Sequence, residues 1–97
     1  MRLRYTLPAL ADLDQILAYI VARSPRGARN VQSRIRAAID LLLQYPFVGT
    51  PTANPSIRRI TTPPYPYLIF YEVAGDEVII HAVRHGARDP SGMPGSS

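Results

Sequence analysis

The chain has 97 residues, enough for one domain and one hydrophobic core. With 46% hydrophobic and 19% charged residues it has the composition of a globular protein, and the absence of cysteine excludes disulfides, thiolate nucleophiles and cysteine-based metal sites. The net charge is +4, and the basic residues are 11 arginines with no lysine. This charge predicts an acidic partner, either nucleic acid or an anionic protein. A GC-rich genome would also enrich arginine.

The N-terminal segment, Met-Arg-Leu-Arg-Tyr-Thr, has no apolar signal core. No apolar run in the sequence approaches the roughly 18 residues that a membrane helix needs. We therefore expect a cytoplasmic protein without a membrane segment.

The first 21 residues predict a short strand and a helix. Residues 2–6 alternate between polar and apolar side chains and form the strand, which Pro8 ends. Pro8 and Asp12 open the helix, and Asp12 and Asp14 are expected in its first turn, where the helix dipole favours anions. The apolar residues that recur at spacings of three and four, and so define the face expected to be buried, are Leu10, Leu13, Ile16, Leu17, Ile20 and Val21.

Residues 24–45 predict a second helix with the clearest periodicity in the chain. Ser24 suits the N-cap and Pro25 the first helical position, and Pro46 follows the expected end at Gln44 or Tyr45. The predicted buried stripe is Ala28, Val31, Ile35, Ala38, Ile39 and Leu42. The two helices are expected to form an antiparallel hairpin that covers the apolar face of a sheet.

The second half of the chain predicts strands. Residues 46–55 are predicted to be a loop, residues 57–60 a strand, and residues 61–64 a turn that leads into a β-hairpin of residues 67–73 and 78–83. The resulting order, β-α-α-β-β-β, is an α+β fold in which a helical hairpin packs on a small, mostly antiparallel sheet. We expect one domain over residues 1–90 and a flexible tail over residues 91–97.

A two-residue turn at Gly75 and Asp76 fixes the expected register of the β-hairpin. Counting from that turn gives the pairs Val73–Val78, Tyr71–Ile80, Phe70–His81, Leu68–Val83 and Tyr67–Arg84. The face expected on the core holds Ile69, Tyr71, Val73, Val78, Ile80 and Ala82. The mixed face, expected to be covered by something else, holds Leu68, Phe70, Glu72, Ile79, His81 and Val83, with His85 at its rim.

The basic residues of the last three strands are the candidates for chemistry. Cleavage of an RNA phosphodiester needs a base, an acid and cations that stabilise the developing phosphorane charge. His85 with Arg58, Arg59 and Arg88 would supply such a set. The alternative is that these arginines pair with an acidic partner or line a solvated edge.

Other catalytic and cofactor sites find no support in the sequence. The serines lack a nucleophile-elbow glycine pattern, and the chain has no phosphate-binding loop or dinucleotide fingerprint, so we expect no cofactor. Two histidines without cysteine argue against a metal site. His81 is expected to be a half-buried histidine with a satisfied hydrogen bond.

Several short segments carry a resemblance to a known family through their order and spacing. They are Tyr5-Thr6 followed by Ala9-Leu10-Ala11-Asp12-Leu13, then Leu43-Gln44-Tyr45-Pro46 with Gly49, Ile57-Arg58-Arg59, Pro66-Tyr67-Leu68-Ile69-Phe70-Tyr71, and Val83-Arg84-His85-Gly86-Ala87-Arg88-Asp89-Pro90. The chain resembles the RelE/ParE superfamily of bacterial type II toxins over nearly its full length. The resemblance implies the same fold and a toxin that halts growth and is neutralised by a co-encoded antitoxin. ParE-like members poison DNA gyrase, and RelE-like members cut messenger RNA in the ribosomal A site.

The departures from the ribonuclease branch favour the ParE-like activity. That branch carries an arginine where this chain has Leu68, and a catalytic tyrosine or histidine near Pro94, where this chain has neither. Arg88 matches the arginine that ends the final strand. The resemblance therefore implies a gyrase inhibitor rather than an enzyme. The alternatives are a ribonuclease in which His85 acts as acid or base, and a binding module with the toxin fold and no activity.

The resemblance also implies an antitoxin that docks an extended segment and a helix on the toxin in a hetero-oligomeric complex. Apolar anchors surrounded by cations would suit an acidic amphipathic helix. The residues expected to contact the antitoxin or the target are Arg58, Arg59, Tyr67, Leu68, Phe70, Arg84, His85 and Arg88.

Overall fold

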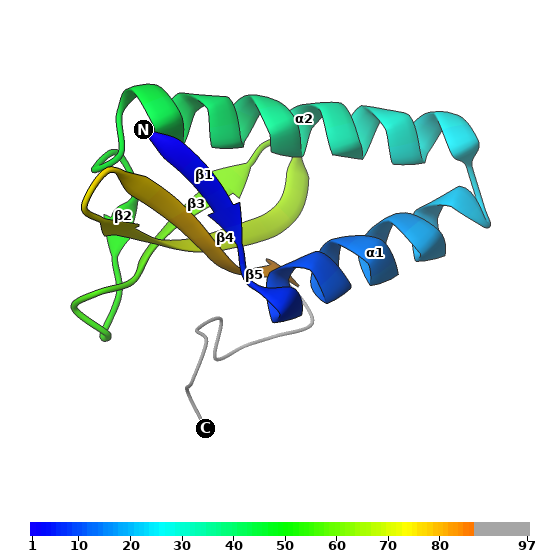
Figure 1. The fold of residues 1–97 in the computed structure, drawn as a ribbon. Helices are drawn as coiled ribbons and strands as arrows, with labels where there is room; N and C mark the ends of the chain where they lie inside the picture. The colour runs from blue at the N-terminus through cyan, green and yellow to red at the C-terminus, as the bar shows by residue number, and fades with distance from the viewer. Residues whose placement is uncertain (87–97) are drawn as a thin grey trace.

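The computed structural model of the protein describes residues 1–86, which form a layer of two helices on a single sheet (Figure 1). In chain order the elements are β1 (Arg2–Tyr5), α1 (Leu7–Val21), α2 (Pro25–Gln44), β2 (Thr50–Pro51), β3 (Arg58–Thr62), β4 (Tyr65–Ala74) and β5 (Glu77–His85). The sheet order is β1-β5-β4-β3-β2, with β1 parallel to β5 and the other neighbours antiparallel. The predicted α+β fold is confirmed. The expected domain end at residue 90 and the expected tail lie outside the described residues.

The short strand β2 lies in the segment that was predicted to be a loop. Its two residues pair with β3 through Thr50–Arg59 and Pro51–Arg58. Two residues, one of them proline, are too few to show the alternation that identifies a strand. The strand β3 likewise extends to Thr62, two residues into the predicted turn.

The helix α2 agrees with its prediction in both its ends and its buried face. Ser24 is the N-cap, its hydroxyl accepts a hydrogen bond from the Gly27 amide at 3.0 Å, and Pro25 begins the helix. The buried residues of α2 are the six predicted ones: Ala28, Val31, Ile35, Ala38, Ile39 and Leu42. They pack on the side chains of β4 and β5 that face the helices.

The helix α1 begins earlier than predicted, because Thr6 and not a later residue caps it. The Thr6 hydroxyl accepts from the Ala9 amide at 3.2 Å, and the first turn holds no acidic residue, so the expected position of Asp12 and Asp14 in that turn is wrong. The expected buried face is also wrong at its margins, since Leu10 and Val21 are about half exposed. Neither α1 nor α2, the helices of residues 1–86, is long and apolar enough to cross a membrane.

The β4–β5 hairpin follows the predicted register only as far as Tyr71. The turn at Gly75 and Asp76 is confirmed, with Gly75 at φ +61°, and Val73–Val78 and Tyr71–Ile80 pair as expected. A β-bulge then inserts His81 as an extra residue in β5. Beyond it the pairs are Phe70–Ala82, Leu68–Arg84 and Tyr67–His85, so the predicted pairs Phe70–His81, Leu68–Val83 and Tyr67–Arg84 are wrong.

The bulge exchanges the faces of the residues that follow it. Val83 packs in the main core with the helices, whereas Ala82 joins Ile57, Phe70 and the partly buried Leu68 in a small cluster on the other side of the sheet. The expected positions of Ala82 on the core face and of Val83 on the mixed face are therefore both wrong. This exchange decides where every candidate residue on the end of β5 lies.

Candidate functional site

The face of the sheet turned away from the helices is the first candidate surface, and we call it the open face. Strand pairing places on it Arg59 of β3, Leu68 and Phe70 of β4, and Arg84 of β5, because directly paired residues share a face. Arg59 is exposed and Leu68 is partly buried, but Phe70 is fully buried. Phe70 is thus the floor of the open face and is not available as a contact residue in this conformation.

Tyr67 and His85 do not lie with the other candidate residues. They pair across β4 and β5 on the helix-covered face, where their rings meet edge to face with centroids 5.4 Å apart. Together with Gln15, Ile16 and Tyr19 of α1 they line an open groove. The predicted place of His85 at the rim of the mixed face is wrong, because the bulge turns this residue toward α1.

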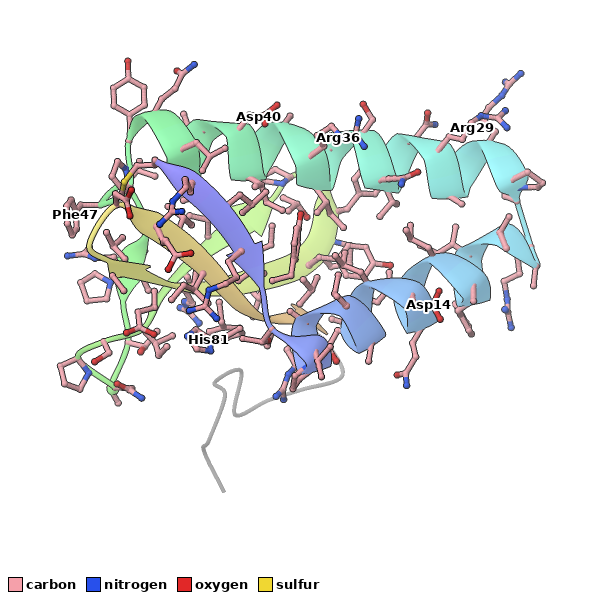
Figure 2. The ribbon with its side chains drawn as sticks, viewed as in Figure 1. Asp14, Arg29, Arg36, Asp40, Phe47 and His81 are labelled. Carbon is pink, nitrogen blue, oxygen red and sulfur yellow. The ribbon has the colours of Figure 1, made fainter. Side chains whose placement is uncertain are left out.

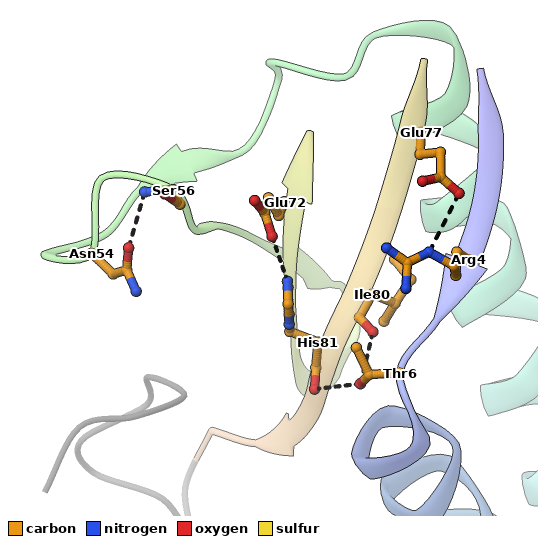
Figure 3. A network of polar contacts seen from close by, with 8 residues as sticks. All are labelled: Arg4, Thr6, Asn54, Ser56, Glu72, Glu77, Ile80 and His81. Carbon is orange, nitrogen blue, oxygen red and sulfur yellow. Dashed lines mark hydrogen bonds and ion pairs between the residues drawn. The ribbon is translucent and has the colours of Figure 1, made fainter. Parts of the chain in front are cut away.

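His81 and Glu72 form a pair on the open face (Figure 3). The Nε2 atom of His81 lies 2.8 Å from Oε1 of Glu72, and both side chains are about 30% exposed. His81 is therefore half-buried and hydrogen-bonded, as predicted. His81 is the extra residue of β5 at the bulge, and it lies on the same face of the sheet as Glu72.

Two residues near the start of α1 hold the bulge in place. The Thr6 hydroxyl lies 3.2 Å from the Ile80 carbonyl and 3.3 Å from the His81 carbonyl (Figure 3). The Asp12 carboxylate accepts a hydrogen bond from the Val83 amide at 3.0 Å. Ile80 is the last residue of β5 that pairs with β1, so these contacts serve backbone groups of β5 at the end of that pairing and just beyond it. The sequence reasoning gave no such role to either residue.

Arg58, a predicted binding or catalytic residue, holds a loop of the protein itself. Its Nη1 atom donates to the Gly49 carbonyl at 2.8 Å and to the Phe47 carbonyl at 3.2 Å, and its guanidinium lies 5.3 Å from the centre of the Phe47 ring. These contacts fix the loop between α2 and β2. The guanidinium is partly buried and already makes hydrogen bonds within the chain.

Tyr71 of β4 holds the same loop through two further hydrogen bonds. The buried Tyr71 hydroxyl donates to the Pro46 carbonyl at 2.8 Å and accepts from the Gly49 amide at 2.9 Å. Burial raises the pKa of the Tyr71 hydroxyl above its usual value of 10.0, and the Gly49 hydrogen bond partly opposes that rise. Gly49 is required here, because a Cβ atom would lie 2.9 Å from the Arg59 carbonyl and closer still to the Tyr71 ring.

The predicted site residues are thus divided among three places. The open face has Arg59, Leu68, Phe70 and Arg84, the α1 groove has Tyr67 and His85, and the α2–β2 loop has Arg58. Arg88 lies outside the described residues. The set proposed for RNA cleavage is not assembled by residues 1–86, because His85 and Arg59 lie on opposite faces of the sheet.

Comparisons with known proteins agree with this fold. Residues 3–90 match the model of a family described as the ParE toxin of the type II toxin-antitoxin system parDE. The protein Y4kP of Sinorhizobium fredii is 40% identical over 79 residues, 81% of this chain and 82% of its own. Toxin RelE2 of Caulobacter vibrioides is 40% identical over 84 residues, 87% of this chain and 93% of its own. A solved chain from the chromosomal ParDE system of P. aeruginosa superposes with a TM-score of 0.74 at 28% identity, covering 88% of this chain and 95% of that one.

Proposed function

The chain belongs to the ParE toxin family of type II toxin-antitoxin systems, and from this premise we propose that it arrests growth by poisoning DNA gyrase. In this account it is a protein inhibitor in the cytoplasm, and not an enzyme. A co-encoded antitoxin neutralises it in a hetero-oligomeric complex.

The choice of target rests on the separation of the residues predicted for RNA cleavage, since His85, Arg58 and Arg59 lie in three different places. An acid or base must lie within hydrogen-bond reach of the phosphodiester that the cations hold. His85 faces α1, Arg59 faces the opposite side of the sheet, and Arg58 is bonded to two loop carbonyls. The position that carries an arginine in the ribonuclease branch is Leu68, whose apolar side chain lies on the open face. This arrangement supports an inhibitor that acts by binding.

The antitoxin is proposed to dock on the open face. Leu68 offers an apolar anchor beside the paired Arg84, and Arg59 is exposed on β3 of the same face. An amphipathic segment with carboxylates would place its apolar side on Leu68 and its charges on the two arginines. Tyr67 and His85 would contact an antitoxin only if a second segment entered the α1 groove. The proposed contact of Arg88 with the antitoxin stays a prediction.

A ribosome-dependent ribonuclease remains the second candidate, because two relatives from Caulobacter vibrioides carry the name RelE. For that activity the hydrogen-bonded His81–Glu72 pair on the open face is the better acid–base candidate, since it shares this face with Arg59 and Arg84. A binding module with no activity is the third. The three differ in what the purified chain does to DNA supercoiling and to ribosome-bound messenger RNA.

The test is gyrase-catalysed supercoiling of relaxed plasmid in the presence of the purified chain. We expect inhibition that adding the cognate antitoxin relieves, with ribosome-bound messenger RNA left intact in a parallel reaction. Cleavage of the messenger RNA with supercoiling unaffected would replace the proposal by the ribonuclease. A chain that affects neither reaction and is tolerated by bacteria would be a binding module.

A further inference from the structure

A cluster of exposed apolar side chains stands at the end of α2 and in the loop that follows it. The exposed fractions are 43% for Leu41, 61% for Tyr45, 65% for Phe47 and 52% for Val48. Leu41 and Tyr45 are one helical turn apart, and Phe47 and Val48 follow at once. Figure 2 shows Phe47 at the end of the molecule remote from Arg29. We call these four residues the end patch.

Single exposed apolar residues are common on protein surfaces, but four within eight positions indicate an interaction site. None of the four belongs to a core cluster formed by residues 1–86, and the last buried residue of α2 is Leu42. Aromatic residues beside an arginine are the composition that protein–protein contacts favour.

The backbone beneath the end patch is held rigidly. The Tyr71 hydroxyl bonds Pro46 and Gly49, and the Arg58 guanidinium bonds the carbonyls of Phe47 and Gly49. These hydrogen bonds therefore fix the loop backbone from Pro46 to Gly49 before a partner binds. A surface ordered in advance loses less conformational entropy on binding.

The charges near the end patch favour an acidic partner. Arg58 places a cation beside the Phe47 ring. The carboxylates of the β4–β5 turn, at the same end of the molecule (Figure 1), are engaged within the chain, Asp76 with Arg2 at 3.4 Å and Glu77 with Arg4 at 3.3 Å. Asp40, the residue before Leu41, lines a separate hollow between the helices and β1.

We propose that the end patch is the surface by which the toxin docks on its target, and that the matching site is an apolar cleft on a folded protein with carboxylates at its rim. This inference rests on the proposed function, in which the toxin acts by binding a protein. It assigns target binding to the α2–β2 loop, at the opposite face of β3 from Arg59 and the proposed antitoxin surface.

The test compares three variants in which the fold is expected to be unchanged. Val48→Ser and the double variant Phe47→Ser/Val48→Ser alter the end patch. Val21→Ser is the matched control, because Val21 is similarly exposed, at 49%, on the last turn of α1. The measurements are growth arrest on induction, inhibition of gyrase supercoiling, binding of the cognate antitoxin, and the melting temperature.

We expect that at least about tenfold more of the double variant is needed for the same growth arrest and the same inhibition of supercoiling. Removal of a contact at the centre of an interface weakens binding by this much or more. Antitoxin binding, the melting temperature and the toxicity of Val21→Ser should stay at wild-type values. Undiminished toxicity of the double variant would overturn the inference. So would lost antitoxin binding with normal melting, because the end patch would then belong to the antitoxin.

The growth readout keeps this inference separate from the proposed function. If the wild-type chain arrests growth without affecting gyrase, the proposed target is wrong. In that case a double variant with lost toxicity still supports the end patch as the docking surface for another protein. If the wild-type chain cleaves messenger RNA and the double variant cleaves it equally well, both proposals fail.

Discussion

The carboxylate of Asp12 on α1 accepts a hydrogen bond from the amide of Val83 on β5, 3.0 Å away and 71 residues along the chain. This contact lies two residues beyond the bulge at His81 and attaches β5 to the helical layer where β1 no longer pairs with it. It therefore helps to set which face of the sheet receives Val83 and His85.

Removal of the Asp12 acceptor should destabilise the fold. Asp12→Ala leaves the Val83 amide without its partner in a partly buried place, and we expect a loss of about 1–3 kcal/mol in the free energy of unfolding. Asp12→Asn keeps an acceptor oxygen and should lose less. Urea denaturation measures both, with exposed Asp14→Ala as the control, expected within about 0.5 kcal/mol of wild type. Equal losses for Asp12→Ala and Asp14→Ala would contradict this role.

The hydroxyl of Tyr71 should contribute comparably. Tyr71→Phe keeps the ring in the core but leaves the Gly49 amide and the Pro46 carbonyl without their partner, at an expected cost of about 1–3 kcal/mol. The α2–β2 loop should also exchange its amide hydrogens faster. Hydrogen exchange at Gly49 and urea denaturation test this, and unchanged protection of the Gly49 amide would show that the hydroxyl does not hold the loop.

Two tyrosines, the buried Tyr71 and the partly buried Tyr5, should make the protein sensitive to alkali. Burial is the main cause that raises the pKa of Tyr5 and of Tyr71 above 10.0, so the unfolded chain ionises first as the pH rises. Their contribution to stability is complete below about pH 10 and is lost as the pH rises toward the folded-state pKa values. The urea concentration at the midpoint of unfolding should therefore be lower at pH 10.5 than at pH 8. This decrease should be smaller in Tyr71→Phe. An equal decrease in that variant would exclude Tyr71 as a source.

Charge reversal on the open face should weaken the antitoxin complex. Arg59→Glu and Arg84→Glu each place a carboxylate where the proposed acidic segment lies, and we expect about tenfold weaker binding for each. Arg29→Glu, exposed on α2, makes the same change of charge away from this face and should leave the affinity unchanged. Titration calorimetry with the purified antitoxin measures all three. The same loss for Arg29→Glu would indicate a general charge effect and no site on the open face.

Periodicity predicted both helices, the strands other than β2, and most of the core, because burial follows it directly. All six stripe residues of α2 are buried, including Leu42 at its end. The helix α1 fits less well because it lies at the margin of the core, where apolar residues such as Leu10 stay about half exposed. Apolar spacing alone does not distinguish the inner from the outer side of such a helix.

The candidate site was less predictable because one extra residue changes the face of every residue after it. The uninterrupted register would have placed Arg84 on the core face beside Ala82, and Val83 on the mixed face. A charged residue directed to the core was the signal that could have indicated a bulge. No comparable signal exists for Tyr71 or Arg58, because their partners in the α2–β2 loop lie up to 25 residues away in sequence.

The most direct test of the account is pulse labelling of DNA, RNA and protein synthesis after induction of the chain alone in bacteria. Poisoning of gyrase predicts that incorporation of thymidine falls first, while incorporation of amino acids continues. An immediate fall in protein synthesis with DNA synthesis intact would contradict the account. His81 and Glu72 would then be the first residues to substitute.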